Sequence, residues 1–203
     1  MSTKKNLDKT IISSMKLVAD DFHENELAYL ALTSKIELPI RDKWAYILYK
    51  RLAHQEFIVS REWKRTDLAI IYKEMPKILI ELKAIYTFDA IADPDNIKGY
   101  PKKMLLDREK ASGLADDDTS IFTVLLATHP LDTVPTKLKK IVKYTVGINH
   151  TFCKLGNSKK IATEAMRIVN KKFENRNVVA KGVLSGGEAF DIGVEVMYWI
   201  IKG

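Results

Sequence analysis

The sequence predicts one domain of mixed α and β structure, on the basis of how its apolar residues are spaced. Between residues 6 and 33, Leu7, Ile11, Met15 and Val18 recur at steps of three or four residues, which is typical of a helix. From residue 57 onward the spacing changes to two, which is typical of strands. Hydrophobic residues make up 46% of the 203-residue chain and charged residues 29%, so the chain can bury a core and is not a disordered protein.

Three helical segments are expected before the first strand. The region 6–33 contains a second short helical segment around residues 27–32. Another helix is expected over 37–53, with Pro39 in its first turn. Proline is tolerated there because its missing N–H would be unpaired in any case.

Three consecutive strands and a helix follow, and then a buried strand. The strands are expected at 57–64, 66–72 and 77–84, and the last two should pair as an antiparallel hairpin because their connection is short. A helix is expected from about 96 to 112. The nearly all-apolar run at 120–127 indicates a strand covered on both faces.

Two amphipathic helices and a β-hairpin are expected at the C-terminal end. The first helix would bury Leu138, Ile141, Val142 and Val146. The second would follow Ser158 as its N-cap residue. In the final hairpin, residues 185–187 (Ser-Gly-Gly) are expected to form the turn between strands 178–184 and 189–201.

Composition excludes several classes of protein. The single cysteine, Cys153, excludes a disulfide framework, a thiolate zinc cluster and a CxxC redox pair. No uncharged apolar run is long enough to cross a bilayer, and the lysines near the N-terminus are not followed by the hydrophobic segment of a secretory signal. These observations predict a cytoplasmic protein with no membrane partner.

The net charge favours a polyanionic partner. The chain has 33 Lys and Arg against 26 Asp and Glu, a formal charge of +7. Nucleic acid is favoured over a membrane surface, because neutralising phosphates releases counterions. Charge alone does not decide the question, because many basic proteins bind no nucleic acid.

The most informative polar residues lie in the third predicted strand. Side chains alternate between the two faces of a strand, so Glu81 and Lys83 share one face of an otherwise apolar segment. If the hairpin pairs as expected, Asp67 at the start of the second strand lies across from Glu81. Two neighbouring carboxylates are costly to bury unless a cation joins them, and Mg²⁺ takes such oxygen ligands. The alternative is that Glu81 and Lys83 lie on a solvated face, and the sequence 62–64 (Glu-Trp-Lys) shows that the bare pattern also occurs elsewhere.

Asp67 followed by Glu81-Leu82-Lys83 resembles the motif of the PD-(D/E)xK nuclease superfamily. The order of predicted elements over residues 35–128 also matches the α-β-β-β-α-β core of that superfamily. Thr66 stands where many members have the proline. The resemblance implies a single domain with a restriction-endonuclease-like core over about 35–128. A helical extension would span 1–34, and extra helices and a hairpin would span 131–203.

The resemblance also implies a site and a reaction. Asp67, Glu81 and the backbone carbonyl of Leu82 would bind Mg²⁺, with Mn²⁺ as an alternative, and Lys83 would complete the catalytic set. Members often have a further acid on the first core helix, and Glu37 is the best candidate for it, with Asp42 as a fallback. A carboxylate at a helix start is equally explained by the helix dipole. The reaction implied is metal-assisted hydrolysis of phosphodiester bonds by an endonuclease of restriction-enzyme type.

The expected partner is DNA, and RNA is not excluded. Phosphate contacts are assigned to Lys64, Arg65, Lys140 and Lys160, although these lysines could equally lie on solvated surfaces. Cutting both strands with one site per chain would favour a homodimer. The alternative function is a catalytically inactive domain on the same scaffold that binds nucleic acid or a protein partner.

Overall fold

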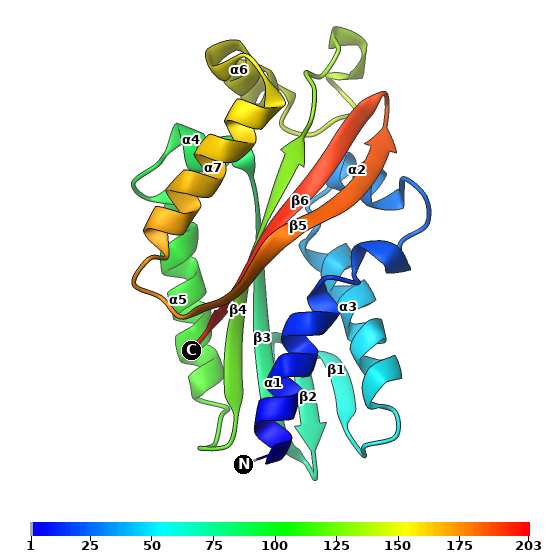
Figure 1. Ribbon diagram of the computed structural model, residues 1–203, viewed down its shortest axis with the longest axis vertical. Coiled ribbons are helices and arrows are strands. Elements are labelled where there is room, and N and C mark those ends of the chain that lie inside the picture. The colour runs from blue at the N-terminus through cyan, green and yellow to red at the C-terminus, as the bar shows by residue number, and fades with distance from the viewer. Residues whose placement is uncertain (1) are drawn as a thin grey trace.

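A mixed sheet forms the centre of the molecule (Figure 1). The computed structural model describes residues 2–203, and in this part of the chain six strands form one sheet in the order β1-β2-β3-β4-β6-β5. Only the β3–β4 pair is parallel. The strands are β1 Ile58–Trp63, β2 Thr66–Tyr72, β3 Met75–Tyr86, β4 Ser120–Pro130, β5 Val178–Ala189 and β6 Ile192–Lys202.

Helices cover both faces of the sheet (Figure 1). One face packs against α1 (Ser2–Met15), α2 (Glu26–Thr33) and α3 (Glu37–Leu52). The other packs against α4 (Thr87–Ala92), α5 (Tyr100–Ser112) and α7 (Ser158–Lys172), with α6 (Thr145–Leu155) next to α4 and α7. No helix in residues 2–203 is both long and apolar enough to cross a membrane. The predicted mixed α and β class, with a central mixed sheet flanked by helices, is therefore confirmed.

The three strands that carry the predicted site are confirmed in position and pairing. The turns β1–β2 and β2–β3 are tight, and both use residues of positive φ: Lys64 and Arg65 in the first, Lys73 and Glu74 in the second. Two-residue turns of this kind match the twist of the paired strands and so set their register. In the β2–β3 pair Leu68 lies opposite Ile80. The helix predicted at 37–53 is α3, and Pro39 lies in its first turn.

The two faces of β3 differ sharply in what they contact. Ile78, Ile80 and Leu82 enter the core formed with α1, α2 and α3. Glu81 and Lys83 point to the opposite face, as strand alternation requires, and this face is the one covered by α5. The long strand β3 therefore has one apolar face and one face on which charged and apolar side chains are mixed.

The first of the two helices predicted after residue 130 is wrong. Residues 136–138 form only a 3-10 turn, and α6 begins at Thr145. The N–H of Lys143 bonds to the carbonyl of Leu32 in α2, and Tyr144 adopts positive φ, so the chain cannot continue as one helix through this point. Val142 is buried as expected, but Ile141 and Val146 are 50% and 70% exposed.

Two details of the C-terminal region also differ from the prediction. The hairpin turn lies at Phe190 and Asp191, both of positive φ, and residues 185–187 instead form an irregularity within β5. A β-bulge accommodates glycine as well as a turn does, which is why the Gly-Gly pair misled the sequence interpretation. The N-cap of α7 is Asn157, one residue before Ser158, and its side chain accepts a hydrogen bond from the N–H of Lys160 at 3.0 Å.

The position of the α7 cap can be tested by substitution. We expect Asn157→Ala to lower the free energy of unfolding by about 1 kcal/mol, because the Lys160 amide loses its acceptor. Ser158→Ala is the matched control and should change it by less than about 0.5 kcal/mol. Urea denaturation monitored by circular dichroism measures both values. A larger loss for Ser158→Ala than for Asn157→Ala would contradict the assignment.

Candidate active site at the fork between two strands

Strands β2 and β3 separate next to the predicted site. Their pairing ends at Leu68 and Ile80, whereas β3 continues to pair with β4 as far as Tyr86. The edge of β3 that faced β2 is therefore left without a partner strand over residues 82–86. Buried backbone amides need acceptors, so the protein must supply them at this fork by other means.

Three carboxylates provide those acceptors. Each accepts a hydrogen bond from one of the three successive N–H groups on the free edge of β3. The pairs are Leu82 N to Asp67 Oδ2 at 2.7 Å, Ala84 N to Glu37 Oε2 at 3.0 Å, and Tyr86 N to Asp89 Oδ2 at 2.9 Å. A row of acidic side chains from β2, α3 and α4 thus replaces the missing strand.

Glu81 lies beside Asp67, as the hairpin register predicted. The Glu81 side chain is buried. Burial, the negative charge of Asp67 and a hydrogen bond between the two carboxyls together raise the pKa of Glu81 to about 8. Asp107 on α5 raises this pKa further, and Lys83 opposes the rise. In the metal-free protein the Asp67–Glu81 pair therefore retains a proton near neutral pH.

Glu37, the first residue of α3, belongs to the same cluster. Burial raises its pKa, Lys83 opposes the rise, and the charge of Asp67 adds to it. Its carboxylate is held by the Ala84 amide. The fallback residue Asp42 is engaged elsewhere, because it pairs with Arg41 at 2.8 Å and with Arg61 at 3.0 Å.

The charge of Lys83 acts on both Glu37 and Glu81, and an acid on α5 fixes its position. Its Nζ lies 2.8 Å from Oδ2 of Asp107. Burial lowers the pKa of Lys83, but the hydrogen bond to Asp107 and the charges of Glu37, Asp107 and Asp67 outweigh it, so the pKa is raised. Lys83 is therefore protonated at any physiological pH.

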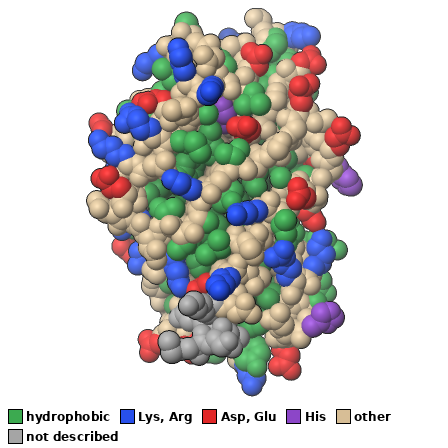
Figure 2. Space-filling model, in the orientation of Figure 1, with side chains coloured by type: hydrophobic (Ala, Val, Ile, Leu, Met, Phe, Trp, Pro, Cys, Tyr) green, Lys and Arg blue, Asp and Glu red, His purple; other side chains and the backbone are tan. Residues whose placement is uncertain are grey.

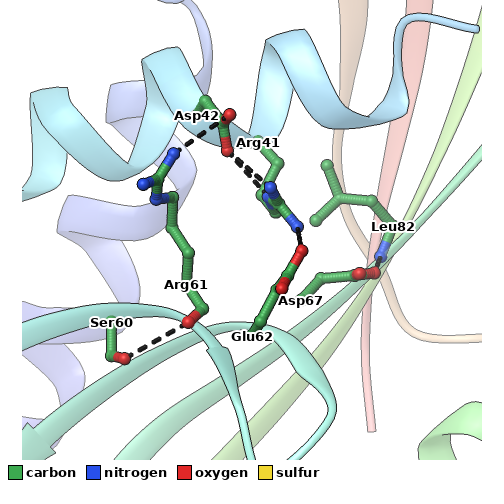
Figure 3. Close-up of polar contacts among 7 residues, drawn as sticks. All are labelled: Arg41, Asp42, Ser60, Arg61, Glu62, Asp67 and Leu82. Carbon is green, nitrogen blue, oxygen red and sulfur yellow. Dashed lines mark hydrogen bonds and ion pairs between the residues drawn. The ribbon is translucent and has the colours of Figure 1, made fainter.

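An ion-pair network anchors the turn that precedes Asp67. Arg41 on α3 is nearly buried and bonds to Glu62 at the end of β1 at 2.8 Å, while it also contacts Asp42. Figure 3 shows this network together with the hydrogen bond that the Leu82 amide donates to Asp67. Arg41 thereby ties the β1–β2 hairpin to the same helix that presents Glu37.

Sequence reasoning missed two acidic residues of this region. Asp107 lies in the helix predicted at 96–112 and meets Lys83 only through packing of that helix on the sheet. Asp89 follows β3 and binds both the Tyr86 amide and Lys98 Nζ, the latter at 2.5 Å. No spacing rule signals the contact of Asp107 with Lys83, because strand and helix lie far apart in the sequence, whereas Asp89 caps the start of α4 only three residues after Tyr86.

The residues assigned to phosphate contacts are distributed over the surface. Lys64 and Arg65 form the exposed turn just before Asp67, and Lys64 lies over the ring of Trp63. Lys140 lies in the irregular segment before α6, and Lys160 in the first turn of α7. On the face seen in Figure 2, Lys and Arg alternate with acidic and apolar side chains, so that face has no single basic patch.

The donor set at the fork fits a hard divalent cation. No group of three or more His, Cys, Asp and Glu side chains in the described part of the chain is arranged to hold a metal ion by itself. Asp67 and Glu81 offer two carboxylates, and the Leu82 carbonyl points to the same side of β3 as its N–H, toward the fork. Mg²⁺ commonly takes one or two carboxylates and completes its shell with water and phosphate oxygens. A cation at this place would also relieve the repulsion that raises the pKa of Glu81.

Comparison with protein-family models, with curated protein sequences and with solved structures finds no match. The functional interpretation therefore depends on the arrangement of this chain's own residues.

The pKa of Glu81 predicts how the stability of the metal-free protein changes with pH. The folded protein keeps the proton of this carboxyl up to about pH 8, whereas the unfolded chain releases it near the usual value of 4.5. The free energy of unfolding should therefore fall as pH rises between these values. Glu81→Gln, which resembles the protonated form, should remove this fall.

Urea denaturation in EDTA at pH 5 and pH 9 measures the effect. Each unit of pKa shift corresponds to about 1.4 kcal/mol. We therefore expect Glu81→Gln to gain a few kcal/mol over the wild type at pH 9 and little at pH 5. The exposed Glu109→Gln is the control for loss of one negative charge. Equal effects of the two substitutions at pH 9 would contradict the burial and pairing of Glu81.

Proposed function

We propose that this protein is a metal-dependent endonuclease of the PD-(D/E)xK type that hydrolyses the phosphodiester bonds of DNA. The observation that supports it is the convergence of Asp67, Glu81 and Lys83 on one face of a strand fork. Glu81 is buried next to a second acid, and its pKa is raised for that reason. Strongly perturbed carboxyls beside a fixed ammonium are typical of catalytic sites.

In this proposal Asp67, Glu81 and the Leu82 carbonyl hold Mg²⁺, or Mn²⁺ in its place. The bound ion supplies charge to polarise a phosphoryl oxygen and lowers the pKa of a coordinated water. Asp67 keeps its place through the Leu82 amide, so one of its oxygens is fixed and the other remains for a ligand. Binding of a cation would displace the proton that the Asp67–Glu81 pair retains.

Lys83 stabilises the negative charge that builds on the phosphate oxygens. Its raised pKa makes it a permanent cation and a poor general base, so its role is electrostatic and positional. Asp107 anchors the Lys83 ammonium through the ion pair at 2.8 Å. Asp107 is thus a positioning residue.

The main test is cleavage by the purified protein. Plasmid, linear duplex, single-stranded DNA and RNA are incubated with Mg²⁺, with Mn²⁺ and with EDTA, and EDTA-sensitive cleavage is expected. A chain with one site cuts both strands of a duplex most simply as a homodimer. Binding that weakens steeply with salt, with no cleavage under any of these conditions, would instead support a non-catalytic nucleic-acid-binding domain.

Substitution of Lys83 and Asp67 separates their two roles. Lys83→Ala should lower kcat by about a hundredfold or more and leave Mg²⁺ affinity within about threefold, since it removes transition-state charge stabilisation. Asp67→Asn should weaken both, because it removes a ligand charge but keeps an oxygen for the Leu82 amide. Steady-state cleavage over a Mg²⁺ titration measures both parameters. Wild-type rates in either variant, with folding verified by circular dichroism, would exclude these roles.

Asp107→Asn tests the positioning role through kinetics. We expect kcat to fall by about tenfold with little change in KM, since Lys83 keeps its charge but loses its anchor. Glu109→Gln, on the exposed side of the same helix, should leave kcat unchanged. A fall of equal size in both variants would point to a general effect of charge on α5.

A further inference from the structure

A basic cavity lies between α5 and α7 on the face of the sheet that carries Glu81. Its volume is about 260 Å³. Four basic side chains line it, Lys102 and Arg108 from α5 and Lys172 and Arg176 from the end of α7, and no acidic side chain does. Figure 1 shows the end of α7 beside α5 and the end of β6, where the chain terminates.

The charges of this cavity are not neutralised within the described chain. None of the four basic side chains forms an ion pair with residues 2–203, and Lys172 bonds only to the backbone carbonyl of Asp95, at 2.5 Å. Lys83 and Arg41, by contrast, have carboxylate partners. Several like charges around one hollow concentrate a positive field that an anion would relieve.

The cavity adjoins the carboxylate cluster. Its wall includes Thr123 of β4, which is the register partner of Glu81 in the parallel β3–β4 pair. Neighbouring strands lie about 4.8 Å apart, so the two side chains are adjacent on the same face. Arg108 directly follows Asp107, the residue that holds Lys83.

We propose that this cavity binds a phosphate group of a nucleic-acid strand whose neighbouring phosphodiester lies at the Asp67–Glu81 pair. This inference rests on the proposed nuclease function and adds to it the part of the site that holds the substrate backbone. Guanidinium groups match phosphate oxygens in a bidentate geometry, lysines add charge, and the Thr123 hydroxyl can donate a further hydrogen bond. A phosphate in the cavity would place the strand beside acids that repel it in the absence of a cation.

The experiment measures binding apart from cleavage. Fluorescence anisotropy with labelled single-stranded and duplex DNA is recorded in EDTA over a range of salt concentrations. Arg108→Gln combined with Arg176→Gln should raise Kd by about tenfold or more and flatten the dependence of log Kd on log salt, because phosphate contacts are lost. The control pair Arg51→Gln with Lys171→Gln removes two exposed charges elsewhere and should change Kd by less than about twofold.

Two additions keep the test decisive. Lys102→Gln replaces the double variant in the test if the double variant does not fold. Lys102 is an exposed residue of the cavity, so this substitution should leave the fold intact and weaken DNA binding. Thermal unfolding with inorganic phosphate separates free phosphate from a strand as the ligand. If the double variant loses stabilisation by inorganic phosphate but binds DNA as the wild type does, the ligand is free phosphate and not a strand. Kd values of the double variant for DNA within twofold of those of the control pair would also overturn the proposal.

Failure of the phosphate-site proposal and failure of the nuclease proposal give different results in these experiments. If the wild type cleaves no nucleic acid but the cavity variants bind DNA at least tenfold more weakly, the phosphate site stands and the proposed reaction fails. If the wild type cleaves in Mg²⁺ and the cavity variants bind DNA as the control pair does, the reaction stands and the phosphate site fails.

Discussion

The free edge of β3 is the constraint from which the site follows. Where β2 departs, three backbone amides face the interior with no strand to accept their hydrogen bonds, and an unpaired buried amide costs about 1–3 kcal/mol. Asp67, Glu37 and Asp89 accept those bonds. Their charged oxygens make strong acceptors, but they also collect negative charge in one place.

This concentration of charge is only partly compensated. Lys83 lies among the acids and is shared with Asp107, and Lys98 pairs with Asp89. The remaining repulsion appears in the raised pKa of Glu81 and of Glu37. On the β4 side of the β3–β4 pair, by contrast, the cavity that Thr123 lines has four basic side chains and no acidic one. Under the proposed function, a strand carrying several phosphates would suit such a surface: one phosphate would meet the cations directly, and another would reach the acids only together with a metal ion.

The sequence predicted the elements that hold the site because each carries its own local signal. Period-two spacing located β2 and β3, and the short turn between them fixed the register that sets Asp67 opposite Glu81. Local signals failed where a distant contact decided the conformation. Lys143 bonds to Leu32 in α2, so helical spacing around it did not produce a helix, and the Phe190–Asp191 turn formed where no glycine marked it. Asp107 was missed for the same reason, since helix packing alone brings it to Lys83.

A purely structural account explains three of the acids at the fork but not Glu81. Glu37, Asp67 and Asp89 each satisfy a backbone amide, and a neutral Asn could do so with less repulsion. Glu81 has no backbone amide among its bonding partners in residues 2–203, is nearly buried, and lies against another carboxyl that raises its pKa. A leucine or threonine at this place would cost the fold less. A residue that breaks local rules without a structural gain is expected at a functional site, and the proposed cation at the two carboxylates would supply the compensation that the fold lacks.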